Sequence, residues 1–154
     1  MINIAKEQKG TALVVRMTGS IEENVNLDQL IGVPAPQMII NCKGVSRINS
    51  VGVKGWIKYF QGAQAKGTQL IFQECSPAIV EQMNLISNFT CGGTVESIFV
   101  PFVSEGDGGE LLGLFKVEDL KKMNFQVPPL KCPRTGKPAV FDDIPEEYFG
   151  FLMR

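Results

Sequence analysis

Few residues in this 154-residue chain carry reactive groups, and they limit the chemistry it can perform. There is no histidine, which removes the commonest general base, the Ser/His and Cys/His nucleophile pairs and the usual imidazole metal ligands. The four cysteines are Cys42, Cys75, Cys91 and Cys132, and no two have the spacing of a metal knuckle or a redox motif. We interpret them as buried thiols, and we expect no metal and no cofactor.

Cys75 is the strongest catalytic candidate. It precedes a helix start at Ser76-Pro77, and the dipole of a helix N-terminus favours a thiolate. The acidic pairs at 142–143 and 146–147 are neighbours in sequence, so they do not share a helix face as a catalytic pair would. A thiol-dependent enzyme using Cys75 therefore stays an alternative, although a cysteine that packs in the core is favoured.

The stretch Arg47–Trp56, RINSVGVKGW, lies between an apolar run and an amphipathic segment. We expect a strand-to-helix corner in which Ser50 Oγ accepts the amide hydrogen of Gly52 or Val53 as an N-cap, and Asn49 is able to serve the same purpose. The Ser50 hydroxyl is also a possible phosphate acceptor, and capping alone is the favoured interpretation.

Strand and helix signals alternate through residues 1–90. In the helix after the corner, Val53, Trp56, Ile57 and Phe60 recur at i, i+3, i+4 and i+7, which predicts an apolar face packed on a sheet. This alternation predicts the α/β class, with parallel crossovers and an antiparallel N-terminal hairpin. The predicted elements are strands at 2–7 and 11–19, a short helix at 26–32, a strand at 37–44, the helix after the corner, a strand at 68–74 and a helix from 76.

Residues 91–154 differ in composition. They carry seven basic and ten acidic residues, against eight and six in residues 1–90. Alternating apolar residues predict a hairpin of strands at 95–103 and 110–117, followed by a proline-rich region and a short helix at 144–154. We expect a second unit here, a small β-rich appendage joined to the first at about residue 90.

Four segments together resemble the STAS domain, found in bacterial anti-sigma factor antagonists and sulfate transporters. They are GSI at 19–21, MIINCKGV at 38–45, INSVGV at 48–53 and LIFQECSPAIVEQM at 70–83, so the resemblance covers roughly residues 1–90. It implies a mixed sheet with packed helices, a signalling role and a protein partner such as an anti-sigma factor or a kinase-like regulator.

The corner departs from the antagonist pattern. Antagonists typically read Asp-Ser-Ser-Gly there, and the hydroxyl before the glycine is phosphorylated. Alignment on Gly52 places Val51 at that acceptor position, Ser50 at the first serine and Asn49 at the aspartate. Since valine has no oxygen, the usual phospho-switch does not carry over.

The appendage resembles a zinc ribbon whose ligands have been lost. Two turns, SEGDGG at 104–109 and CPRTGKP at 132–138, match its paired Cys-x-x-Cys-Gly knuckles. The matching ligand positions are Ser104, Asp107, Cys132 and Thr135, of which only Cys132 is a thiol. A structural zinc site needs four Cys or His ligands, so we expect a degenerate ribbon without zinc.

We therefore predict a non-enzymatic bacterial regulatory module that binds a partner protein at the corner. The predicted partner-binding residues are Asn49, Ser50, Gly52, Lys54 and Lys58, because the two lysines form a basic stripe beside a helix start that tolerates anions. The alternatives are a phospho-regulated switch at Ser50 and the thiol enzyme described above.

Overall charge and hydropathy argue against nucleic-acid-binding and membrane-spanning proteins. The net charge of −1 gives no electrostatic footprint for nucleic acid, and the acidic appendage lacks a basic, aromatic strand face. No segment has the roughly 20 apolar residues that cross a bilayer. The N-terminus MINIAKEQKG has no leader-like apolar run, so we expect a cytoplasmic protein.

Overall fold

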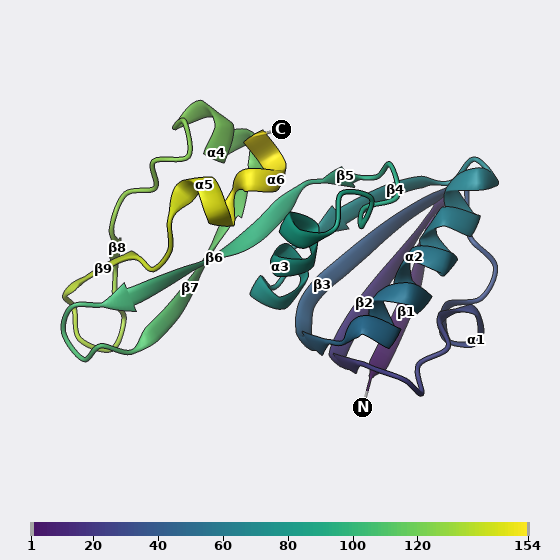
Figure 1. The fold of residues 1–154 in the computed structure, drawn as a ribbon, viewed down its shortest axis with the longest axis horizontal. Coiled ribbons are helices and arrows are strands. Elements are labelled where there is room, and N and C mark those ends of the chain that lie inside the picture. The colour runs from purple at the N-terminus through teal and green to yellow at the C-terminus, as the bar shows by residue number, and fades with distance from the viewer. Residues whose placement is uncertain (1, 154) are drawn as a thin grey trace.

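The computed structural model describes residues 2–153 and contains two β-sheets (Figure 1). The elements are β1 (Asn3–Lys9), β2 (Ala12–Ile21), α1 (Leu27–Ile31), β3 (Gln37–Ile48), α2 (Ser50–Ala65), β4 (Gln69–Gln73), α3 (Pro77–Leu85), β5 (Thr94–Val95), β6 (Ser97–Ser104), β7 (Glu110–Lys116), α4 (Val117–Lys122), β8 (Leu130–Lys131), β9 (Pro138–Phe141), α5 (Pro145–Tyr148) and α6 (Gly150–Met153).

The first sheet has the order β1-β2-β3-β4-β5, with β1 antiparallel to β2 and every other neighbouring pair parallel. Met38 is paired with Leu70 and Ile40 with Phe72, so alternate residues of β3 and β4 share one buried face. Helices α2 and α3 cover this face (Figure 1). The predicted α/β class with a mixed sheet and packed helices is confirmed.

Trp56 lies at the centre of the core beneath α2. Its side chain is fully buried, and its ring centroid lies 4.8 Å from those of Phe60 and Phe89. Its Nε1 donates a hydrogen bond to the Phe89 carbonyl at 3.0 Å, which satisfies the one polar atom of the ring. The apolar helix face predicted from Trp56 and Phe60 is confirmed.

The second sheet is antiparallel, with the order β7-β6-β9-β8. It is joined to the first unit through the start of β6, where the Phe99 amide donates to the Cys75 carbonyl and the Cys75 amide donates to the Ser97 carbonyl. The Tyr148 hydroxyl donates to the Phe99 carbonyl, and Phe149 is fully buried. The two sheets therefore share one continuous apolar core.

Two boundaries and one helix differ from the expected arrangement. β5 pairs with β4, so the first sheet extends to Val95, beyond the expected junction at residue 90. The strand expected at 95–103 is divided between β5 and β6. Helix α4, which follows β7 directly, was not predicted, because its N-cap position is Lys116 and carries no capping side chain.

Among residues 2–153, no helix combines the length and the apolar character that a membrane span requires.

Candidate functional site

Asn49 holds the strand-to-helix corner in place from both sides. Its Oδ1 accepts the Gly52 amide hydrogen at 2.8 Å, which caps the N-terminus of α2. Its Nδ2 donates to Glu23 Oε1 at 3.0 Å, and Glu23 lies in the connection between β2 and α1. One side chain thus fixes the start of α2 against a loop 26 residues away in sequence.

Ser50 does not cap the helix, which corrects the favoured interpretation of the sequence. Asn49 occupies the N-cap position, and Ser50 is the first residue of α2 with an exposed side chain. Val51, at the position of the missing phosphate acceptor, is 46% exposed. A hydroxyl and an isopropyl group therefore stand side by side on the surface of the corner.

Gly52 permits the close approach of α2 to the end of β2. A Cβ atom at this position would lie 2.1 Å from the Ile21 carbonyl oxygen. The same carbonyl accepts the Asn49 amide hydrogen at 3.2 Å, so the contact is part of the corner itself. Gly52 is buried and cannot contact a partner directly; it serves the predicted site by setting its geometry.

Lys54 and Lys58 are exposed on the outer face of α2, as expected for a basic stripe. With Ser50 they fall at i, i+4 and i+8, which places all three along one line of the helix. Among residues 2–153, no carboxylate forms an ion pair with either lysine. We call Ser50, Val51, Lys54 and Lys58 the corner surface.

Cys75 is fully buried, contrary to what the thiol-enzyme alternative needs. Its thiol forms a hydrogen bond with the thiol of Cys42, and this bond together with burial raises the pKa of Cys42 well above its usual value. Cys42 lies within β3 and Cys75 lies two residues beyond the end of the neighbouring strand β4, in the shared core. No substrate can reach this thiol in the folded chain.

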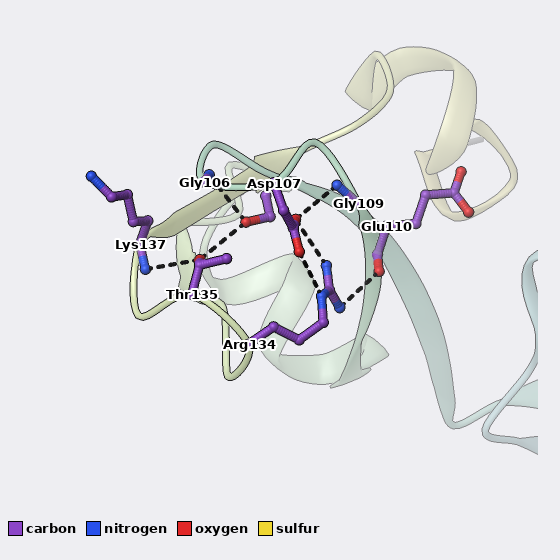
Figure 2. A network of polar contacts seen from close by, with 8 residues as sticks. Gly106, Asp107, Gly109, Glu110, Arg134, Thr135 and Lys137 are labelled. Carbon is purple, nitrogen blue, oxygen red and sulfur yellow. Dashed lines mark hydrogen bonds and ion pairs between the residues drawn. The ribbon is translucent and has the colours of Figure 1, made fainter.

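The two turns of the appendage, at 104–109 and 132–138, contact each other. Ser104 Oγ lies 3.4 Å from Thr135 Oγ1, and Figure 2 shows Asp107 and Arg134 reaching toward each other from opposite turns. Arg134 Nε donates to Asp107 Oδ2 at 2.9 Å, and a terminal nitrogen donates to Oδ1 at 3.2 Å. This ion pair and the hydroxyl contact bridge the turns.

Cys132 is the first residue of the second turn, and its side chain is fully buried. Hydrogen bonds from the Ser104 hydroxyl, then from the Thr135 hydroxyl and nearby backbone amides, lower the pKa of Cys132 to about 7. The Arg134 guanidinium holds the pKa of Asp107 well below its usual range. At neutral pH the turns therefore hold the Asp107 carboxylate and a partly ionised Cys132 thiol beside a single arginine.

This set of side chains does not fit a structural zinc ion. Cys132 is its one thiol, Ser104 and Thr135 offer only hydroxyls, and the Asp107 carboxylate is bound by Arg134. Over the described residues 2–153, no three His, Cys, Asp or Glu side chains are grouped so as to hold a metal ion.

Sequence reasoning missed two residues of the corner. The residues around Glu23 give no sign of its contact with Asn49, because the two residues are 26 positions apart in the sequence. Val51 was considered only for the hydroxyl it lacks, and its side chain proves to be 46% exposed. The predicted Asn49, Ser50, Gly52, Lys54 and Lys58 do lie together on the first turns of α2 and its cap.

No model of a known protein family matches the sequence, and neither does any curated protein. Among solved structures, one titled "Crystal Structure of an Anti-sigma Factor Antagonist from Mycobacterium paratuberculosis" is similar to this chain. The two share 22% sequence identity, and the match covers 62% of this chain and 85% of that chain with a TM-score of 0.49.

Proposed function

We propose that the chain is a non-enzymatic bacterial regulatory module that binds a partner protein through the corner surface. The observation that carries this proposal is the fixed exposure of Val51, which is 46% exposed at the start of a helix held by Asn49 and Gly52. An apolar side chain on a rigid corner binds with little loss of conformational entropy. The residues that hold the corner, Asn49 and Gly52, are thus next to Val51, the residue proposed to contact the partner.

The charges of the corner surface define the partner. Lys54 and Lys58 extend from Val51 along α2 without an ion-pair partner among residues 2–153. The helix N-terminus adds a partial positive charge. A fitting partner presents an acidic surface beside a small apolar recess. The resemblance of residues 1–90 to the STAS domain suggests an anti-sigma factor or a kinase-like regulator, in a cytoplasmic setting.

A second candidate function is regulation by phosphorylation of Ser50. It is favoured by the finding that Asn49, and not Ser50, caps α2, which leaves the Ser50 hydroxyl exposed. A phosphate there would lie beside the helix N-terminus, with Lys54 one turn away. Intact mass of the protein from its own cells tests this: an added phosphate that Ser50→Ala removes supports the switch, and an unmodified mass under every growth condition sinks it.

Affinity capture with matched variants tests the docking proposal. Val51→Asp places a carboxylate in the apolar contact, and Lys54→Glu reverses the basic stripe. Val33→Asp is the control, because Val33 is 85% exposed but precedes β3, at the other end of that strand from the corner.

We expect the wild type and Val33→Asp to recover the same stoichiometric partner, and Val51→Asp and Lys54→Glu to lose it. The proposal fails if no stoichiometric partner is recovered, or if all four proteins recover it equally.

A further inference from the structure

Strand β7 is a sheet edge with no strand on its outer side. In the order β7-β6-β9-β8 it pairs with β6 alone, and within residues 2–153 nothing else pairs with it. It is seven residues long, and Leu112 and Leu114 on its outer face are 49% and 51% exposed. Figure 1 shows β7 along one border of the appendage. A long apolar edge of this kind invites pairing with another strand.

The other edges of the two sheets are protected, which sets β7 apart. β1 has Lys6 and Glu7 in its interior, and charges within an edge strand oppose pairing. β5 and β8 are each two residues long, too short to template another strand. In β7 the charges stand only at the two ends, and the interior, LLGLF, is apolar.

The alternation of backbone hydrogen bonds between β6 and β7 shows which backbone groups of β7 do not bond to β6. At one end of the hairpin the Ser104 amide donates to the Gly109 carbonyl, and at the other the Val117 amide donates to the Glu96 carbonyl. Since bonded residues alternate in an antiparallel pair, the odd-numbered residues of β7 bond to β6. The amide and carbonyl groups of Leu112 and Leu114 therefore point outward.

The sequence of β7 is complementary to itself when reversed. In an antiparallel pairing centred on Gly113, Glu110 of one chain lies opposite Lys116 of the other, Leu111 opposite Phe115, and Leu112 opposite Leu114. This register sets all seven residues opposite one another, brings opposite charges together at both ends, and matches the outward groups of Leu112 with those of Leu114. The Glu110 carbonyl accepts a hydrogen bond from Arg134 Nη1 at 3.3 Å, and pairing exchanges this bond for one from the Lys116 amide of the other copy. A register shifted by one residue in either direction about Gly113 loses the charge match.

We propose that two copies of this chain associate through antiparallel pairing of β7 with β7 about a two-fold axis at Gly113. The two four-stranded sheets become one continuous sheet of eight strands. Leu112 and Leu114 of both copies then form a four-leucine cluster on one face, and the Glu110–Lys116 pair occurs twice. Such an interface is isologous, so it closes at the dimer and leaves no further edge of β7 free.

Sedimentation equilibrium of the full chain tests the dimer. We expect the wild type to reach twice its monomer mass of 16.9 kDa as concentration rises. Leu112→Lys removes two leucines and adds two charges per dimer, and should weaken association about 100-fold or more. Leu85→Lys is the control, since Leu85 is 70% exposed at the end of α3 and should leave the dimer unchanged. Circular dichroism of each variant shows that it is folded.

The register is tested by charge exchange and by cross-linking. Glu110→Lys or Lys116→Glu alone should weaken dimerisation about tenfold, because like charges then face each other twice, and the double exchange should restore it. Leu112→Cys mixed with Leu114→Cys should form an intermolecular disulfide under a copper–phenanthroline oxidant, while neither variant alone does so efficiently.

A wild type that stays monomeric, a dimer that Leu112→Lys leaves intact, or a Leu112→Cys protein that cross-links to itself as fast as the mixture would each overturn the proposal. Because the corner surface lies on α2 in the other unit, none of these results bears on partner docking there.

Discussion

Asn49 Nδ2 donates to Glu23 Oε1 at 3.0 Å while the Oδ1 of the same side chain caps α2. This relationship ties the loop after β2 to the first turn of the helix that carries Ser50 and Val51. A contact surface that depends on an exposed valine gains from this arrangement, because the helix start cannot fray away from the sheet.

Replacing Asn49 with alanine should lower the free energy of unfolding by about 1–2 kcal/mol, because α2 loses its N-cap. Asn49→Asp retains an oxygen for the Gly52 amide but sets a carboxylate beside Glu23, so it should recover only part of that loss. Glu23→Gln combined with Asn49→Asp should remove the repulsion. Urea unfolding of the four proteins measures this. Equal stability of Asn49→Ala and the wild type would show that the cap is not needed.

Gly52→Ala should be destabilising by about 3 kcal/mol or more, because the new Cβ meets the Ile21 carbonyl oxygen at 2.1 Å and α2 must move off β2. Gly62→Ala is the matched control in the same helix, where a Cβ meets nothing within 4 Å. It should be stabilising by about 0.5–1 kcal/mol, since glycine in a helix interior is costly. Thermal unfolding compares the two. The close approach at the corner is disproved if both substitutions have the same sign and size.

The Cys132 thiol should titrate near pH 7 in the folded protein. This pKa of about 7 lies below the ordinary thiol pKa, so the thiolate raises the free energy of unfolding. The contribution is present in full when the pH is above the ordinary thiol pKa, and it is lost as the pH falls through about 7. Ser104→Ala should shift the ultraviolet thiolate titration toward higher pH, because the Ser104 hydroxyl is the largest cause of the lowered pKa.

Cys132→Ser identifies which part of the titration belongs to this thiol. If Ser104→Ala leaves the pKa of Cys132 unchanged, the hydrogen bond from the Ser104 hydroxyl to the thiolate would be contradicted.

Cys75 should react with a mild thiol reagent only as fast as the protein unfolds, because its side chain is fully buried beside Cys42. Mass mapping of the labelled peptides at neutral pH measures the rate at each of the four cysteines. The labelling rate should rise with urea in step with unfolding. Rapid, selective labelling of Cys75 in the folded protein would revive the thiol-enzyme alternative.

The sequence was sufficient for the parts of the fold that depend on local pattern. The apolar period of Val53, Trp56 and Phe60 predicted the helix face that packs on the sheet. Here a short segment and its spacing determine which side chains face inward.

Long-range contacts and competing caps could not be predicted in this way. Asn49 and Ser50 both have side chains that can cap a helix, and only the path of the chain out of β3 decides between them. The Asn49–Glu23 bond depends on the pairing of β2 with β3. α4 begins at Val117 without a capping side chain, and the acidic residues Glu118 and Asp119 of its first turn are its remaining start signal.

The most direct test of partner docking is a photo-crosslinking amino acid placed at position 51 and, as a control, at position 33, each expressed in the protein's own cells. Both valines are exposed, at 46% and 85%, so accessibility alone favours the control. We predict one discrete cross-linked partner from position 51, lost when Lys54→Glu is added, and none from position 33. Equal cross-linking from the two positions, or none from position 51, would contradict binding at the corner.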